Sequence, residues 1–151
     1  MNFWMKTKVC FLLIILSISL QAQETKKKAI HQVLDSWHEA AAKADFHTYF
    51  GLMAEQSVFI GTDAMENWQR EAFEAFSKPY FDQGKAWSFE ARERNIYISA
   101  DGSVAWFDEL LDTWMGTCRG SGVLENVGDA WKIRPVSYTH LTLPTNTNAW
   151  R

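Results

Sequence analysis

Two adjacent carboxylates, Asp108 and Glu109, lie within an aromatic and aliphatic stretch of the sequence, Val104 to Met115. A carboxylate partly removed from water beside apolar side chains has a raised pKa, which suits a general base near neutral pH. Side chains alternate along a strand, which would place Glu109 on the face of Phe107 and Asp108 on the opposite face. Glu109 is therefore the first candidate catalytic residue. The alternative interpretation is a simple cross-strand ion pair with Arg94.

Two further residues are candidates for acid–base chemistry. His38 lies at the edge of the apolar stripe of a predicted helix, where it is either a partner acid or base or an ordinary hydrogen-bonded boundary residue. Asp63 begins an Asp-x-x-Glu pattern that is typical of a helix start, so it is either a helix cap or a base. The sequence has no histidine or cysteine cluster at metal spacing, no glycine-rich phosphate loop and no Gly-x-Ser-x-Gly turn. It therefore predicts neither a metal nor a cofactor.

Three helices are predicted before the main sheet. Apolar residues from Ala29 to Ala44 recur at helical spacing in one stripe. Asp45 is a candidate cap for a short second helix. A short strand follows at Ser57 to Ile60, and a third helix is expected to begin at Asp63 and to end near Pro79.

The region from residue 87 to 133 predicts four antiparallel strands in meander order. The first reversal, at Asp101-Gly102, is typical of a tight hairpin turn. The pairs expected across it are Ile98 with Ala105, Ile96 with Phe107, Arg94 with Glu109, and Arg92 with Leu111. The apolar residues change faces near Arg92 to Asn95, which predicts a bulge that bends the sheet.

A bent sheet covered by three helices would enclose a cone with an apolar interior. The candidate residues for a ligand pocket in this cone are mostly aromatic: Trp37, Phe59, Trp68, Tyr80, Trp87, Arg94 and Phe107. Pockets with aromatic walls and few polar groups bind small apolar molecules. The alternative is that these rings only fill the core.

The length of 151 residues favours one domain. Residues 1–22 have the layout of a secretory signal peptide, with a short basic region, an apolar run from Val9 to Leu20 and a small residue, Ala22, at the expected cut. The alternative, an uncleaved membrane anchor, requires a longer run, of about 20 residues. Residues 23–28 would form a linker. We therefore expect a periplasmic or secreted protein that is not membrane-bound after cleavage.

Charge and cysteine content limit the possible partners of the mature chain. The net charge of −3 falls to about −5 without the signal peptide, and no basic stripe is present, which argues against nucleic acid. Cys118 is the one cysteine that would remain after cleavage, so an intramolecular disulfide is impossible.

The end of the chain has an unusual composition. Its first part, VSYTHLTLPT from Val136 to Thr145, is similar to the translation of a sequencing adapter. We interpret residues 135–151 as a non-native, adapter-derived tail; the alternative is a natural polar tail. The threonines and the tyrosine have strand propensity, so a strand can continue into this segment.

The order helix, helix, strand, helix and antiparallel meander resembles the nuclear transport factor 2-like (NTF2-like) superfamily. Five segments resemble its SnoaL-like branch, common in bacterial secreted proteins: LDSWHEAAAKADFHTYFGLM from Leu34, VFIGTDAMENW from Val58, KPYFDQGKAW from Lys78, AWFDELLD from Ala105 and RGSGVL from Arg119. The resemblance implies an α+β fold at residues 29–134, an NTF2-like cone with three N-terminal helices packed on a bent antiparallel sheet. It implies little about activity, because this fold hosts many functions.

The ketosteroid isomerases of this superfamily have an aspartate base after the first strand. The matching position here is about Gly61, which cannot act as a base, and Asp63 lies two residues further on. Many members pair through the outer face of the sheet. Trp106 and Trp114 are expected on that face, where an apolar patch would favour a homodimer.

Two functional hypotheses follow. The first is a secreted or periplasmic domain that binds a small apolar molecule, with acid–base chemistry at Glu109. The second is a non-catalytic domain whose filled cone serves dimerisation or protein interaction. An open cavity would favour the first hypothesis, and a filled interior would exclude it.

Overall fold

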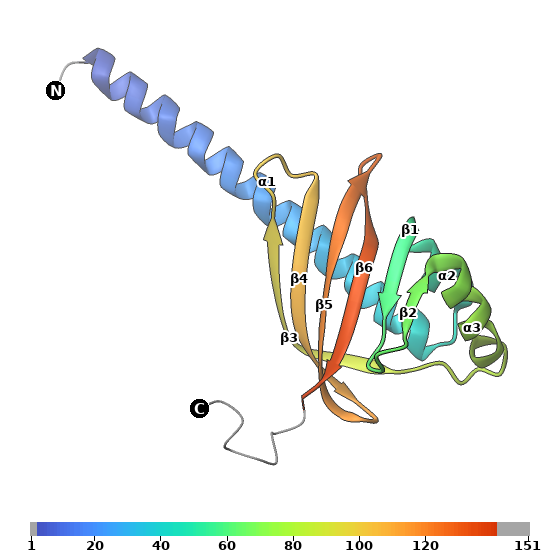
Figure 1. Cartoon of the computed structure of the whole chain (residues 1–151). Helices are drawn as coiled ribbons and strands as arrows, with labels where there is room; N and C mark the ends of the chain where they lie inside the picture. Colours follow the sequence, from blue (N-terminus) through green and yellow to red (C-terminus); the bar gives the residue numbers. More distant parts are fainter. Residues whose placement is uncertain (1–2, 142–151) are drawn as a thin grey trace.

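The structure is a computed structural model, and it describes residues 3–141 of the chain. It combines one long helix, two short helices and a single sheet (Figure 1). The elements, in chain order, are α1 (Phe3–Ala42), α2 (Phe46–Gly51), β1 (Met53–Ile60), β2 (Asn67–Gln69), α3 (Arg70–Asp82), β3 (Phe89–Ile98), β4 (Val104–Thr113), β5 (Gly116–Val127) and β6 (Ala130–His140).

The long helix α1 includes most of the predicted signal peptide (1–22) and all of the predicted linker (23–28). Its N-terminal part extends away from the sheet, and its C-terminal part crosses one face of the sheet (Figure 1). Within the described residues, no helix combines the length and the apolar character needed to span a membrane.

The sheet has six strands in the order β2-β1-β6-β5-β4-β3. The predicted meander of β3 to β6 is confirmed, because each consecutive pair is antiparallel. The predicted bent antiparallel sheet is found, and among the described strands only β1 and β6 pair in parallel. The parallel pairing arises because β1 reaches β6 through a long connection rather than a hairpin, and such connections allow parallel neighbours.

The register between β3 and β4 follows the sequence prediction except at one pair. Three predicted pairs are confirmed: Ile98 with Ala105, Ile96 with Phe107, and Arg94 with Glu109. The pairing of Arg92 with Leu111 is wrong, because Ala91 lies opposite Leu111. Arg92 lies at a register shift between Ala91 and Glu93, which confirms the predicted bulge.

The third helix differs from the prediction at both ends. Residues 61–66 form a turn in which Asp63 accepts from the Met65 amide at 2.8 Å and Glu66 accepts from the Asp63 amide at 3.2 Å. These side-chain bonds resemble those of a helix start, but here they close a turn before β2. The helix α3 therefore begins at Arg70. It continues through Pro79 to its last residue, Asp82.

The second helix begins as predicted. Asp45 is its N-cap, and the Asp45 carboxylate accepts from the Thr48 amide at 3.0 Å. Hydrogen bonding with the Thr48 side chain, followed by this bond from the Thr48 amide, holds the pKa of Asp45 below its ordinary value.

The core lies between α1 and the sheet. The buried stripe of α1 recurs every three or four residues, at Ile30, Leu34, Trp37 and Ala41. It packs on inner-face residues of the sheet that are completely buried, such as Leu111 and Ile133. A second group of rings, contributed by α2 and α3, closes the end of the core: Tyr49, Phe50, Phe73 and Phe81.

The last strand extends into the segment that we interpret as non-native. β6 continues to His140, and Val136 and Tyr138 are buried in the core. The adapter origin of this segment stays a prediction, and residues 142–151 lie outside the described residues.

Candidate functional site

An aromatic cavity opens between α3, the end of β1 and the turn that joins β4 to β5. Its volume is about 250 Å³, and eight of its twelve lining residues are aromatic. The lining residues are Phe59, Gly61, Thr62, Glu66, Phe73, Phe76, Tyr80, Trp87, Phe89, Trp114, Met115 and Tyr138. The interior is therefore not completely filled at this end.

The inner wall of the cavity is built from stacked rings. Phe59 of β1 and Phe73 of α3 stack with their ring centroids 3.9 Å apart. The Trp87 ring lies 5.7 Å from that of Phe73, and the Tyr138 ring lies 5.7 Å from that of Phe59. Such closely packed aromatic rings hold one another in place, so the inner wall is preformed.

The rim of the cavity is more exposed. Phe76 and Tyr80 are 40% and 48% exposed, and they follow the buried Phe73 along one side of α3 at intervals of three and four residues. Trp114 occupies the turn after β4 and has 81% of its surface exposed. Gly116 ends that turn with a φ of +94°, a conformation that glycine adopts without strain.

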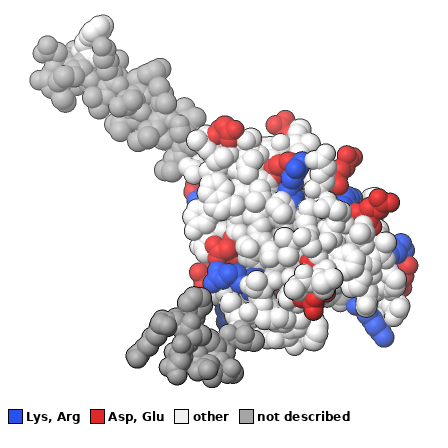
Figure 2. Space-filling model, in the orientation of Figure 1, with Lys and Arg blue, Asp and Glu red and all other residues white. Residues whose placement is uncertain are grey.

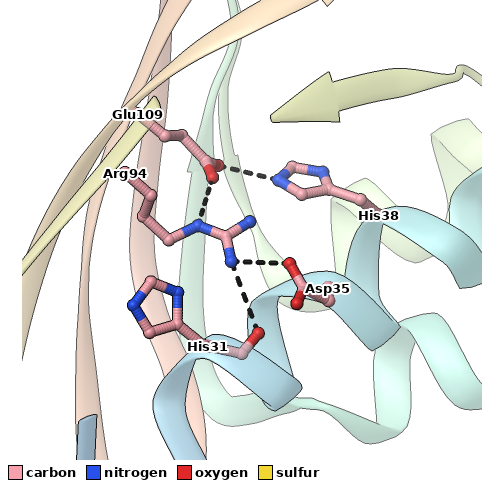
Figure 3. Close-up of polar contacts among 5 residues, drawn as sticks. All are labelled: His31, Asp35, His38, Arg94 and Glu109. Carbon is pink, nitrogen blue, oxygen red and sulfur yellow. Dashed lines mark hydrogen bonds and ion pairs between the residues drawn. The ribbon is translucent and has the colours of Figure 1, made fainter. Parts of the chain in front are cut away.

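A second candidate site is a buried cluster of charged groups between α1 and the sheet (Figure 3). The Glu109 side chain has no exposed surface. One of its oxygens lies 2.7 Å from His38 Nε2, and the other accepts a hydrogen bond from Arg94 Nε at 2.7 Å. Arg94 Nη1 also donates to Asp35 at 2.6 Å and more weakly to the His31 carbonyl at 3.4 Å. The cluster thus ties α1 to both β3 and β4.

The pKa of Glu109 lies below its ordinary value, which corrects the expectation from the sequence. Burial acts to raise the pKa of this carboxyl, as expected. The hydrogen bond and charge of His38, together with the charge and hydrogen bond of Arg94, outweigh the effect of burial. Glu109 is therefore held as a carboxylate, and a base with a raised pKa is not what the structure provides.

Three buried polar atoms in or next to this cluster have no hydrogen-bond partner within residues 3–141: Arg94 Nη2, Trp37 Nε1 and the Tyr138 hydroxyl. Burial raises the pKa of Tyr138 well above its ordinary value. Buried polar groups without a protein partner commonly bond to an internal water or a ligand.

The family model for the SnoaL-like domain matches residues 30–140. This chain belongs to the SnoaL-like domain family. The match covers the whole sheet and the C-terminal part of α1, including the first residues of the segment interpreted as non-native. None of the curated proteins matches the sequence.

Solved structures with the same fold include several NTF2-like proteins. An NTF2-like protein of unknown function from Pseudomonas putida is 14% identical, with a TM-score of 0.65 over 85% of this chain and 93% of that one. A candidate dehydratase of the NTF2-like family from Streptomyces avermitilis is 13% identical, with a TM-score of 0.67 over 80% and 99%. The association domain of C. elegans CaMKII is 18% identical, with a TM-score of 0.64 over 79% and 98%. At these identities the likeness shows the fold alone, and it confirms the NTF2-like cone.

The SnoaL-like domain places the ten predicted site residues in several different surroundings. Phe59, Tyr80 and Trp87 line the cavity. Glu109, His38 and Arg94 are brought together in the buried cluster, which does not line the cavity. The other four lie elsewhere: Trp37 and Phe107 in the core, Trp68 stacked on Phe76, and Asp63 in the turn before β2.

The cluster and the cavity are neighbours, separated by aromatic rings. Phe89 lines the cavity, and its ring centroid lies 6.4 Å from that of His38. The Phe89 ring also packs edge-on against the Tyr138 ring, at 5.2 Å. The Phe89 ring therefore lies between the cluster and the cavity.

Several residues of the cavity were not predicted as site residues. Phe73 and Phe76 lie within the predicted third helix, and their spacing with Tyr80 was the signal that could have placed them together. Trp114 was expected on the outer face of the sheet beside Trp106, which is wrong. β4 ends at Thr113, so the alternation of faces stops before Trp114, which lines the cavity instead.

Potential metal ligands are not grouped in the structure. Among the described residues, no set of three or more His, Cys, Asp or Glu side chains is placed to hold a metal ion.

Acidic and basic side chains are interspersed on the face shown in Figure 2.

Proposed function

We propose that this SnoaL-like domain binds a small apolar molecule in the aromatic cavity. The observation that carries the proposal is the open cavity of about 250 Å³ with eight aromatic lining residues. A dry apolar cavity of about 150 Å³ holds benzene, so this one has room for a molecule of one or two rings. Fused four-ring molecules such as steroids are expected to bind worse, because ligand pockets of larger molecules start at about 300 Å³.

Binding rather than acid–base catalysis is the primary role in this proposal. Both Glu109 oxygens are engaged by His38 and Arg94, and the carboxylate does not line the cavity. Acid–base chemistry at Glu109 would require a proton to pass through His38 and around the ring of Phe89. The geometry therefore supports a positioning role for the cluster, in which it holds α1 and the inner wall of the cavity in place.

Thermal-shift measurements on the full chain test the binding proposal. One-ring, two-ring and steroid-sized compounds are compared, and the smaller compounds are expected to raise Tm. Trp114→Ala removes an exposed rim residue and is expected to reduce the shift. Trp106→Ala removes an exposed indole from the outer face and serves as the matched control. If no compound raises Tm, or if both variants lose the shift equally, the cavity is not the binding site.

A second candidate function, self-association, is favoured by one observation on the outer face of the sheet. Tyr97 and Trp106 stack at 5.8 Å there, although they are 48% and 46% exposed. Exposed apolar pairs of this kind often mark an interface. Light scattering of wild type and Trp106→Glu tests this function, because a dimer formed through this face would dissociate in the variant.

We also propose that the domain is periplasmic or secreted. The proposal is supported by the arrangement of charged, apolar and small residues in the first 22 positions.

A further inference from the structure

A single carboxylate, that of Glu66, lines the otherwise aromatic cavity. Glu66 is the one charged residue among the twelve that surround the cavity. It belongs to the turn at residues 61–66, and it is partly buried. Two backbone bonds fix this turn, from the Gly61 amide to the Glu66 carbonyl at 2.9 Å and from the Glu66 amide to the Asp63 carbonyl at 3.0 Å.

The Glu66 side chain is folded back over Gly61, at the end of β1. A Cβ atom added at Gly61 would lie 2.0 Å from Glu66 Oε2 and 2.8 Å from Glu66 Cβ. A side chain at position 61 would therefore displace the carboxylate. Glu66 Oε2 accepts from the Asp63 amide at 3.2 Å, which leaves the other oxygen, Oε1, without a hydrogen bond from any described residue.

The rest of the cavity is suited to a positive charge. The faces of aromatic rings attract cations, and Phe76, Tyr80 and Trp114 supply such rings near the rim. No lysine or arginine lines the cavity. An adjoining groove shares Tyr80, Trp87 and Trp114 with the cavity and contains two more acids, Glu90 and Asp112, and one base, Lys85. Asp112 is already paired with Arg92.

We infer that the ligand carries a cationic group, an ammonium or alkylated ammonium, which Glu66 and the aromatic rim receive. The apolar part of the ligand would enter between Phe59, Phe73 and Trp87. An anionic ligand would be repelled by Glu66, and a purely apolar ligand would leave this carboxylate unused. The inference rests on the proposed binding function and names the class of molecule that it takes.

The test uses three compounds that share one ring and differ in charge: 2-phenylethylamine, 2-phenylethanol and phenylacetate. Their affinities for the full chain are measured by NMR titration or calorimetry at low salt and neutral pH. The amine is expected to bind about tenfold more tightly than the alcohol, because its positive charge adds attraction to the Glu66 carboxylate and to the aromatic rings that the neutral hydroxyl lacks. Phenylacetate is expected to bind most weakly.

Variants of the turn assign the preference to Glu66. Glu66→Gln keeps the shape of the side chain and is expected to bring the amine and the alcohol within about twofold of each other. Glu93→Gln removes an exposed carboxylate that does not line the cavity, and it should leave the preference unchanged. Gly61→Ala is a second route, because the added Cβ moves the carboxylate without removing its charge. This variant should also lower the preference for the amine.

The outcomes separate this inference from the function on which it rests. Equal affinity of wild type for the alcohol and the amine would overturn the cationic class and leave the binding function standing. A preference for the amine that survives in both Glu66→Gln and Gly61→Ala would overturn the role of Glu66. Failure of all three compounds and of the neutral aromatic panel to bind would overturn both proposals.

Discussion

Replacing Glu109 with glutamine should destabilise the fold strongly, although the change removes only one charge. The Arg94 side chain is 5% exposed and has two carboxylate partners, Glu109 inside the core and Asp35 at the surface. Removing one partner from a buried ion pair costs about 3–5 kcal/mol. Asp35 remains and the glutamine carbonyl can still accept from Arg94, so we expect the lower end, about 3 kcal/mol. This would be a large share of a typical stability of about 5–15 kcal/mol.

Asp108 offers a matched control on the same strand. It pairs with Arg119 at 2.6 Å, nearly the same distance as Glu109 with Arg94, but both side chains of that pair are partly exposed. Exposed pairs contribute about 0–1 kcal/mol, so Asp108→Asn should hardly change the free energy of unfolding. Urea denaturation with a shared m-value measures both variants. A cost for Glu109→Gln below about 1 kcal/mol, or one equal to that of Asp108→Asn, would refute the reasoning from burial.

Four further predictions follow from the structure. Because the pKa of Glu109 is lowered in the folded state, its stabilising contribution should be complete above the ordinary value of 4.5 and should be lost as pH falls through the folded-state pKa. Urea midpoints measured from pH 7 downward should therefore fall less in Glu109→Gln than in wild type, and parallel curves would contradict this. Phe73→Ala should cost about 3–5 kcal/mol of unfolding free energy and weaken ligand binding, because Phe73 is buried and stacks on Phe59; unchanged binding would contradict the position of the cavity. A chain that ends at Arg134 should have a much lower Tm than one that ends at His140, because the shorter chain lacks the buried Val136 and Tyr138. Resequencing the gene across position 135 tests the separate prediction that this segment is non-native. Mass spectrometry of protein exported from a bacterial host should find an N-terminus at Gln23, and a retained Met1 would contradict the signal-peptide prediction.

The parts of the site that sequence reasoning predicted are those that depend on local periodicity. Strand alternation correctly separated Asp108 from Glu109, and hairpin pairing correctly placed Arg94 opposite Glu109. His38 was identified as a possible partner from its place at the edge of a helix stripe. That His38 and Glu109, 71 residues apart, lie within 2.7 Å depends on how α1 crosses the sheet, which periodicity does not specify.

The parts that were missed depend on competing local structures or on distances. The Asp63 to Glu66 pattern fits both a helix start and a turn, and the structure uses it as a turn. Because the pattern was interpreted as a helix start, the third helix was predicted to begin too early, and Glu66 was not predicted as a cavity residue. The direction of the pKa shift of Glu109 depends on how closely His38 and Arg94 approach its carboxylate, so the general-base hypothesis, which considered only burial beside Phe107, expected the opposite direction.

The buried ion cluster also determines where along its axis α1 can rest on the sheet. Its apolar stripe alone would tolerate a shift by one turn, because Ile30, Leu34 and Trp37 would exchange one large apolar contact for another. A shift of about 5.4 Å would, however, separate Glu109 from His38 and Arg94 from Asp35, so the buried Glu109–Arg94 pair would lose both of its partners on α1. The cluster therefore gives α1 a single register along its axis on the sheet. Apolar contacts alone do not supply this specificity. The distance of 6.4 Å between the rings of His38 on α1 and Phe89 on β3 is a consequence of that register.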